Sequence, residues 1–171
     1  MDSITIKQIE NKEVWESFLA NHAEANFLQS WYWGEFHKAL GSKIQRSGFY
    51  KADVLVGVML SIVEDARRGR YLTVPAGPII DWQDGDVVAS FISTIKKIAT
   101  QGNCVFIRVR PQLEANDFSK TLYKKNGFLS APIHLHAELT SQLDLAPTEE
   151  QLLAKMRKAT RYEIKKGTVA G

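Results

Sequence analysis

The segment 84–101 constrains the fold of this chain more than any other feature of its sequence. Acidic residues open this segment and Gly102 follows it, which is typical of the start and end of a helix. Apolar runs at 70–74 and 104–110 flank it and predict strands. The sequence therefore predicts a strand, helix, strand unit. The apolar residues that recur with the helical period are Val88, Phe91, Ile92, Ile95 and Ile98.

The other elements predict a sheet that is mostly antiparallel. Residues 51–53 form a turn between two strands, which makes those strands an antiparallel hairpin. An antiparallel meander followed by a strand, helix, strand unit indicates an α+β (mixed α/β) fold with helices flanking the sheet. We expect strands at 3–9, 43–50, 54–63, 128–131 and 136–145, and helices around 14–19, 31–40 and 117–127, the last capped by Asp117.

Length and cysteine content bound the kind of protein. A chain of 171 residues can bury roughly 70% of its unfolded surface around one core, so it needs no disulfide or metal for stability. Cys104 is the only cysteine and borders an apolar run, which indicates a buried thiol rather than a nucleophile. We therefore expect a reducing compartment.

Charge and hydropathy limit the kinds of partner that the protein can have. The net charge of +3 and the pI near 8.9 permit a polyanionic partner without requiring one. No apolar run approaches the roughly 20 residues that span a bilayer, and residues 1–3 do not begin a signal peptide. We expect a cytoplasmic protein without stable membrane insertion.

The end of the chain predicts a helix with a cationic side. Thr148 and Gln151 have the spacing of a capping box before a helix over 152–167. One side of that helix is apolar, which fits packing against a core. The other side of the helix carries a stripe of cationic residues. This cationic stripe fits binding of RNA or phosphate, or it is simply a solvated face. The apolar residues are Leu152, Leu153, Met156 and Ile164, and the candidate RNA-binding residues are Lys158, Arg161, Tyr162 and Lys165.

Several short segments resemble, in the same order along the chain, the FemABX family of peptidoglycan bridge aminoacyltransferases. The resemblance spans nearly the whole chain but only about the first half of a typical member. The segments are 27–30 (Phe-Leu-Gln-Ser) with Trp33 and Gly41, 74–78 (Val-Pro-Ala-Gly-Pro), 106–109 (Phe-Ile-Arg-Val) before Pro111, 136–145, 148–150 and 156–162.

The resemblance implies an acyl-CoA N-acyltransferase (GNAT)-like fold. It implies that residues 1–146 form a first GNAT-like domain and 147–171 the helical start of a truncated second one. The parent would move an amino acid from aminoacyl-tRNA to the stem-peptide amine of a cell-wall precursor, which is UDP-MurNAc-peptide or a lipid-linked form. No cofactor is implied. The chain alone should be inactive, because the groups nearest the chemistry belong largely to the second domain.

The resemblance also points to substrate-binding residues around the predicted helix 31–40. Gln29, Trp33 and Lys38 lie where family members approach the sugar-nucleotide part of the acceptor. His37 can take the place of Lys38, and Trp33 can instead be a core residue.

Arg108 and Arg110 alternate on a strand and share one face, so they can clamp a diphosphate or carboxylate, or pair with surface acids. His134 and His136 have the same spacing, but we see no third ligand and predict no metal. No catalytic residue is assigned from the sequence.

A free-standing acyl-CoA N-acyltransferase is one alternative function. Its pyrophosphate normally lies on backbone amides at a helix N-terminus. The two prolines of the turn 75–78 remove two such donors, which disfavours coenzyme A. The other alternative is a non-catalytic module that binds RNA or a partner through its basic helix.

Overall fold

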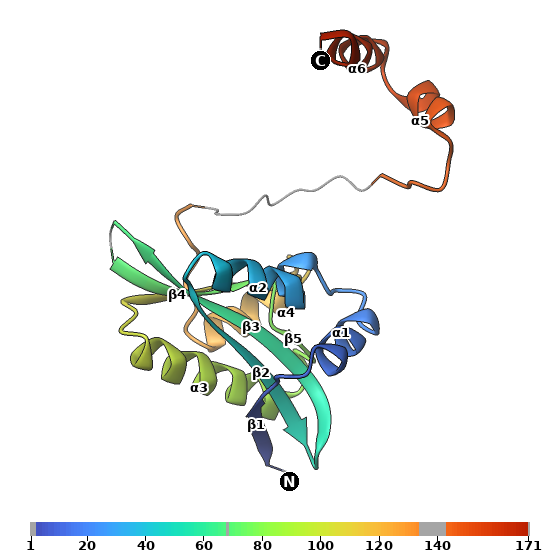
Figure 1. Cartoon of the computed structure of the whole chain (residues 1–171). Coiled ribbons are helices and arrows are strands. Elements are labelled where there is room, and N and C mark those ends of the chain that lie inside the picture. The colour runs from blue at the N-terminus through green and yellow to red at the C-terminus, as the bar shows by residue number, and fades with distance from the viewer. Residues whose placement is uncertain (1–2, 68, 134–142, 171) are drawn as a thin grey trace. The chain divides into compact units, whose positions relative to one another are not determined.

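The computed structural model describes residues 3–67, 69–133 and 143–170 (Figure 1). The chain divides into two compact units, Met1–Ser130 and Ala131–Gly171. The first unit contains β1 (Ile4–Gln8), α1 (Lys12–Ala20), the 3-10 helix η1 (Phe27–Gln29), α2 (Trp31–Ala39), β2 (Lys43–Lys51), β3 (Val54–Ala66), β4 (Gly69–Pro75), β5 (Ile79–Ile80), α3 (Gly85–Gln101), β6 (Phe106–Arg110) and α4 (Asp117–Lys125). The second contains α5 (Glu149–Lys155) and α6 (Lys158–Ala170).

A six-stranded sheet forms the centre of the first unit, in the order β1-β2-β3-β4-β6, with β5 paired to β3. All pairs are antiparallel except β4 with β6, which are parallel and joined through α3. The predicted hairpin and the predicted strand, helix, strand unit are both confirmed. The parallel pairing brings the carboxyl ends of β4 and β6 together, with Pro75 opposite Arg110.

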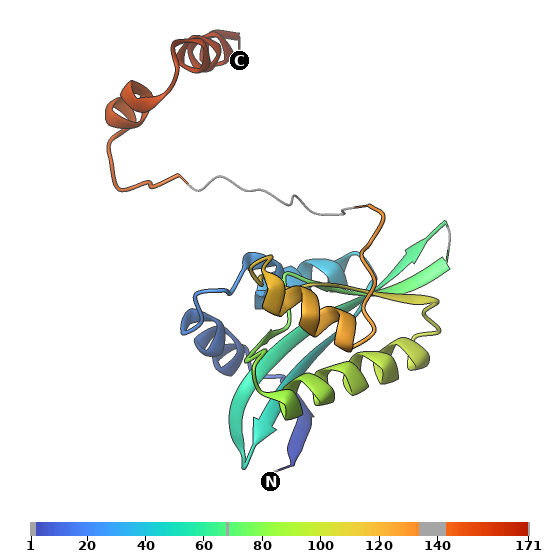
Figure 2. The same cartoon turned by 180° about the vertical axis from the view of Figure 1, so that it is seen from behind.

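Two hydrophobic clusters pack on opposite faces of the sheet. Leu72 and Val74 of β4 face α3, where they join Phe91 and Ile95, and the α4 residue Leu122 packs against the same cluster. Figure 2 views the face that carries α3 and α4. On the other face, Leu60 and Ile62 of β3 pack with Trp15 and Leu19 of α1 and with the aromatic residues of α2. The alternation of β3 and β4 side chains therefore decides which residues each helix covers.

Helix α3 forms where the sequence predicts it, for local reasons. The side chain of Asp84 accepts hydrogen bonds from the backbone amides of Asp86 and Val87, and Gly102 ends the helix. At α4 the predicted cap is wrong by one residue. Asn116 accepts from the amide of Ser119 in a capping box, whereas Asp117 is the first helical residue.

Three further expectations differ from the structure. Residues 128–131 form no strand, and the predicted strand 136–145 lies mostly outside the described residues, with 143–145 not in a strand. The single helix predicted over 152–167 is two helices, because Met156 takes an extended conformation with ψ of 154°. Cys104 is only partly buried, although burial still raises the pKa of its thiol.

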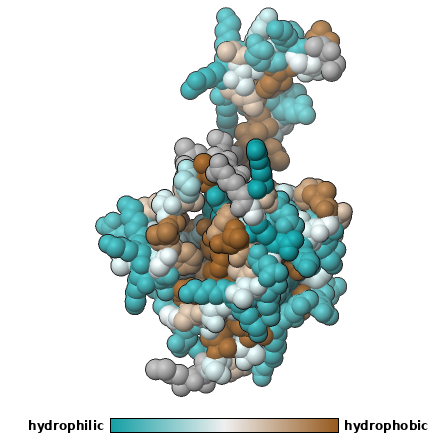
Figure 3. Space-filling model, turned by 90° about the vertical axis from the view of Figure 1, so that its left-hand side faces the viewer, coloured by the Kyte–Doolittle hydropathy of each residue, from teal (hydrophilic) through white to brown (hydrophobic). Residues whose placement is uncertain are grey.

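Apolar side chains also remain on the surface, as the brown areas of the space-filling view show (Figure 3). On the first unit they include Phe27, Tyr32, Phe36 and Leu40, each at least half exposed. Tyr32, Phe36 and Leu40 are four residues apart, so they lie along one side of α2, and the Phe27 ring packs edge-on against Trp33 of the same helix. In the described part of the chain, every helix is too short or too polar to cross a bilayer.

Candidate functional site

A row of polar side chains crosses β4 and β6 on the face opposite α3. Tyr71 is paired in register with Phe106, and Thr73 with Arg108. Because Leu72 and Val74 point toward α3, these alternate residues point to the other face of the sheet, and Arg110 follows Arg108 on the same side. We call Tyr71, Thr73, Arg108 and Arg110 the polar strand face. It contains both arginines that the sequence singled out.

Helix α2 adds a histidine and a tryptophan beside this face. His37 Nδ1 lies 3.3 Å from Glu64 Oε1, and Glu64 is the β3 residue paired with Tyr71. The His37 ring packs edge-on against Trp33, with ring centroids 5.0 Å apart. Within the described residues, the buried Trp33 Nε1 and His37 Nδ1 atoms have no hydrogen-bond partner. His37 Nδ1 thus faces the Glu64 carboxylate at a distance that does not meet hydrogen-bond geometry, and the indole nitrogen of Trp33 is a buried donor without a partner, which costs stability.

Tyr71 is held as a neutral hydroxyl at the centre of this group. Burial raises the pKa of Tyr71, the neighbouring Glu64 carboxylate raises it further, and Arg108 opposes the shift. Its ring stacks on Phe106 with the centroids 4.9 Å apart. The side chain can therefore donate a hydrogen bond from a fixed position.

Lys38 lies on the solvent side of α2, away from the side occupied by its neighbour His37. Its side chain is 55% exposed and its ammonium group lies 3.4 Å from Glu35 of the same helix. Of the two candidate residues at this place, His37 is the one that reaches the sheet. Lys38 as a substrate-binding residue stays a prediction.

Gln29 is completely buried and bridges two strands. Its Oε1 accepts from the amide of Leu60 at 2.7 Å, and its Nε2 donates to the carbonyls of Leu60 at 3.2 Å and of Pro75 at 2.6 Å. The β3–β4 ladder reaches only as far as Ile62 and Thr73, so the Gln29 amide supplies the hydrogen bonds that the strands no longer exchange. These hydrogen bonds give Gln29 a structural role between β3 and β4. Substrate binding by Gln29 stays a prediction.

The N-terminus of α3 carries an internal anion. The Asp84 carboxylate accepts from the first-turn amides and lies 3.1 Å from Lys51 Nζ. The hydrogen bond from Lys51, together with those from the amides of Val87 and Asp86, lowers the pKa of Asp84. Amides that hold a carboxylate of the same chain cannot also hold a pyrophosphate. The structure thus adds a second obstacle to coenzyme A besides the two prolines.

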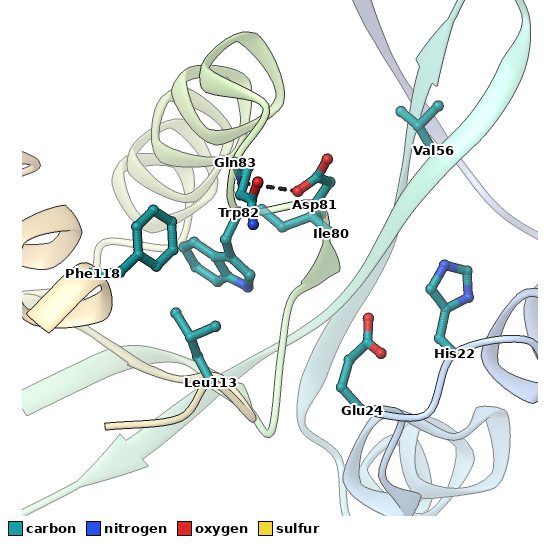
Figure 4. Close-up of a pocket in the computed structure, with 9 residues that line it drawn as sticks. All are labelled: His22, Glu24, Val56, Ile80, Asp81, Trp82, Gln83, Leu113 and Phe118. Atoms are coloured by element: carbon teal, nitrogen blue, oxygen red, sulfur yellow. Dashed lines mark hydrogen bonds between the residues drawn. The ribbon is translucent and has the colours of Figure 1, made fainter. Parts of the chain in front are cut away.

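A pocket of about 390 Å³ lies beside β5 and the β5–α3 connection (Figure 4). Its walls come from these two segments, from the loop after α1, from the start of β3, and from the segment between β6 and α4 together with the first turn of α4. The side chains drawn in Figure 4 are His22, Glu24, Val56, Ile80, Asp81, Trp82, Gln83, Leu113 and Phe118. None of these residues is predicted as a site residue from the sequence.

In the second unit the predicted cationic stripe is exposed. Lys158, Tyr162 and Lys165 lie on α6 and are open to solvent. Arg161 has another contact, because its Nη1 donates to the carbonyl of Met156 at 2.7 Å and to that of Ala154 at 3.4 Å. Arg161 therefore caps the end of α5. RNA binding by these residues stays a prediction.

Glu64 and Tyr71 are not predicted as site residues from the sequence. The strand hairpin could have indicated them, since counting outward from the turn between β3 and β4 places the two opposite each other.

His134 and His136 lie outside the described residues. Among the residues that the structure describes, no group of three or more His, Cys, Asp or Glu side chains could hold a metal ion.

Comparison with known proteins identifies relatives of this fold. A family model described as the FemAB family matches residues 9–127. A solved structure of FemX is similar with a TM-score of 0.71 and 16% identity, over 94% of this chain and 42% of that chain. The chain thus spans less than half the length of that FemX chain. A search of curated proteins finds no match.

Acetyltransferases of known structure are also similar. A possible acetyltransferase from Clostridium difficile 630 has a TM-score of 0.54 and 14% identity, over 82% of this chain and 100% of that chain. The aminoglycoside 6'-N-acetyltransferase AAC(6')-IG from Acinetobacter haemolyticus has a TM-score of 0.54 and 13% identity, over 82% of this chain and 99% of that chain. At such identities the likeness concerns the fold alone. The predicted α+β, GNAT-like fold is confirmed.

Proposed function

The chain belongs to the FemAB family, and we propose that it is the first domain of an aminoacyltransferase of peptidoglycan biosynthesis. In this proposal residues 1–146 form one GNAT-like domain and 147–171 begin a second, which the protein needs for activity. The proposal is supported by the family match and by the likeness to FemX, of which this chain covers 42%. The amino acid would come from aminoacyl-tRNA, which places the reaction in the cytoplasm.

The observation that carries the proposal is the polar strand face beside α2. It presents two arginines, the neutral Tyr71 hydroxyl and the His37–Glu64 pair on one side of the sheet. Guanidinium groups bind phosphate oxygens in a bidentate manner, and a tyrosine hydroxyl binds a sugar or phosphate oxygen. We assign this face to the sugar-nucleotide part of a cell-wall precursor such as UDP-MurNAc-peptide.

In this reaction the main task of the domain is to hold the acceptor substrate in position. The amine of the stem peptide attacks the aminoacyl ester, an amide bond forms, and the ester C–O bond breaks to release the ribose hydroxyl of the tRNA, which takes up the proton that the amine loses. The ester is already activated, so no nucleophilic side chain is required. Holding the acceptor in place turns a bimolecular encounter into a local one, which supplies much of the rate. Donors that face the developing negative charge of the intermediate supply the rest, and we expect them in the second domain.

Two alternative functions can be distinguished from this proposal. A free-standing acyl-CoA transferase needs pyrophosphate donors, whereas the turn 75–78 has two prolines and the start of α3 holds Asp84. Calorimetry with acetyl-CoA should therefore give no saturable heat, and micromolar binding would favour that alternative. A non-catalytic RNA-binding module would bind tRNA through α6 yet bind no precursor.

The experiment that tests the proposal is titration of the chain with UDP-MurNAc-pentapeptide in a calorimeter. Replacing Arg108 and Arg110 by Gln should weaken binding by about tenfold or more, since each removes a charge-assisted contact with phosphate. Lys96→Gln with Lys97→Gln on the exposed side of α3 is the matched control and should leave the affinity unchanged. Absence of binding, or equal affinity of the arginine variant, would reject the assignment of this face.

A further inference from the structure

Arg46 of β2 is a buried cation that joins the sheet to helix α2. Its side chain is 6% exposed. Its Nη2 atom donates to the backbone carbonyl of Trp31 at 2.7 Å and to Glu35 Oε1 at 3.0 Å. Its guanidinium group lies over the Trp31 ring, with Cζ 3.6 Å from the ring centroid. Two residues of α2 that are one helical turn apart therefore hold the guanidinium group in place.

Helix α2 approaches this guanidinium group so closely that glycine is the residue that fits at position 34. A Cβ atom added to Gly34 would lie 2.9 Å from Arg46 Cζ and closer still to Nη2. The guanidinium group cannot move aside without losing its hydrogen bonds and its contact with the Trp31 ring. It therefore acts as a spacer that sets both the distance between α2 and β2 and the rotation of α2 about its own axis.

The ion pair between Arg46 and Glu35 is a weak source of stability. The Glu35 side chain is 42% exposed, whereas Arg46 gives up nearly all of its hydration. Within the described residues, the Nε atom of Arg46 has no hydrogen-bond partner. Burial of a charge is repaid only when its pairing and its hydrogen bonds are complete, so an apolar side chain of similar size would stabilise the fold about as well. The geometry that the guanidinium group imposes on α2 is thus the better reason for its place.

The same helix carries two residues of the candidate site on another side. Trp33 and His37 are four positions apart and pack edge-on, and His37 Nδ1 lies 3.3 Å from Glu64 Oε1 beside the polar strand face. Backbone hydrogen bonds hold the turns of a helix together, so a change in rotation at Gly34 also moves Trp33 and His37. The contacts of Arg46 can therefore reach the candidate site through the helix.

We propose that Arg46 is a positioning residue, which holds α2 at the distance and rotation that place Trp33 and His37 beside the polar strand face. Arg46 is buried and acts through the helix rather than by touching a ligand. The proposal rests on the function proposed above, because that function assigns the polar strand face to the cell-wall precursor.

The first measurement needs no ligand. Arg46→Met keeps a buried, unbranched side chain against Trp31, and the half-exposed Glu35 carboxylate can return to water. Arg46 bonds to Trp31 and Glu35, so a shifted indole signal of Trp33 in proton–nitrogen NMR spectra would report movement of the helix. The indole signal of Trp82, on the α3 side of the sheet, should stay in place. An unchanged Trp33 signal would overturn the proposal.

The second measurement is calorimetric titration with UDP-MurNAc-pentapeptide. Arg46→Met should bind at least about tenfold more weakly, because small displacements of positioned groups are costly. Ile95→Val is the matched control, since it lowers stability in the cluster between α3 and the sheet and should keep the wild-type affinity. Wild-type affinity of Arg46→Met, or an equal loss in Ile95→Val, would overturn the proposal. If the wild-type chain itself does not bind the precursor, the proposed function fails, and the Trp33 signal still decides whether Arg46 positions α2.

A second variant displaces the guanidinium group without removing its charge. Gly34→Ala should give the same shift of the Trp33 signal and a similar loss of affinity, because its methyl group takes the place of Arg46 Nη2. In the Arg46→Met background Gly34→Ala should add little, since the flexible end of methionine can yield. Fully additive losses of affinity would overturn the proposal.

Discussion

The side-chain amide of Gln29 occupies the space that a side chain at position 77 would need. A Cβ atom added to Gly77 would lie 2.5 Å from Gln29 Cδ, a distance that real contacts do not show. The same amide bonds to Leu60 and Pro75, so it is fixed on its polar side and cannot withdraw. Two motifs that lie far apart in the chain, 27–30 and 74–78, therefore depend on each other.

The first prediction follows from this contact. Gly77→Ala should destabilise the chain by about 1–3 kcal/mol, because the new methyl group displaces a buried and hydrogen-bonded amide. Urea unfolding followed by circular dichroism measures the change. Gly85→Ala, at the start of α3 where a Cβ meets open space, is the control and should change little. A neutral Gly77→Ala would mean that Gln29 moves aside freely.

The second prediction concerns Gln29 itself. Gln29→Ala leaves the amide of Leu60 and the carbonyls of Leu60 and Pro75 without their partner, and each such buried group costs about 1–3 kcal/mol. In this background Gly77→Ala should cost much less, since the blocking amide is gone. A double-mutant cycle measures the coupling. Additive effects of the two substitutions would contradict the direct contact.

The third prediction is a pH dependence that isolates the charge of Asp84. Asp84→Asn keeps a capping acceptor at α3 and removes the ion pair with Lys51. The hydrogen bond from Lys51 lowers the pKa of Asp84 in the folded chain, so the carboxylate stabilises the fold above its unfolded pKa of about 3.9. That stabilisation is lost as the pH falls through the lowered value.

Urea unfolding at a series of pH values checks this. The wild-type chain should be more stable than Asp84→Asn at pH near 7, and the difference should shrink below about pH 4. Glu10→Gln, an exposed acid in the loop after β1, controls for the general effect of one charge. If the difference in unfolding free energy between the wild-type chain and Asp84→Asn is the same at every pH, the effect comes from the shape of the side chain rather than from its charge.

The fourth prediction tests the cationic side of α6. Lys158→Gln with Lys165→Gln should reduce the slope of log affinity for tRNA against log salt by about 1.4–1.8, if each lysine contacts one phosphate. Arg161 is left in place because it caps α5. Filter binding over a range of salt concentrations gives the slope, with Lys96→Gln and Lys97→Gln as the control pair. An unchanged slope would make the stripe a solvated face.

The fifth prediction compares two helices by amide hydrogen exchange. Helix α3 buries Val88, Phe91 and Ile95, whereas α6 is exposed over its described side chains. Amides of α5 and α6 should therefore exchange at least about tenfold faster than those of α3. A second GNAT-like domain, if it packs on these helices, should slow their exchange. Equal protection of α3 and α6 in the isolated chain would contradict the prediction.

The sequence by itself determined the elements whose patterns are local. The helical period and the acidic start predict α3, and the turn at 51–53 predicts the β2–β3 hairpin. The spacing of Thr148 and Gln151 predicts the capping box of α5. Each of these features depends on residues within one or two turns of the chain, so no distant contact is needed to recognise it.

Only the tertiary structure decided which residues meet. His37, Glu64, Tyr71 and Arg108 come from four elements, and the register of β3, β4 and β6 places them on one face. From the sequence Gln29 is a candidate substrate-binding residue, and only the structure shows that its amide has three partners beyond the end of the β3–β4 ladder. The reason is physical: a side chain's hydrogen-bond partners depend on long-range strand pairing, which local periodicity does not encode.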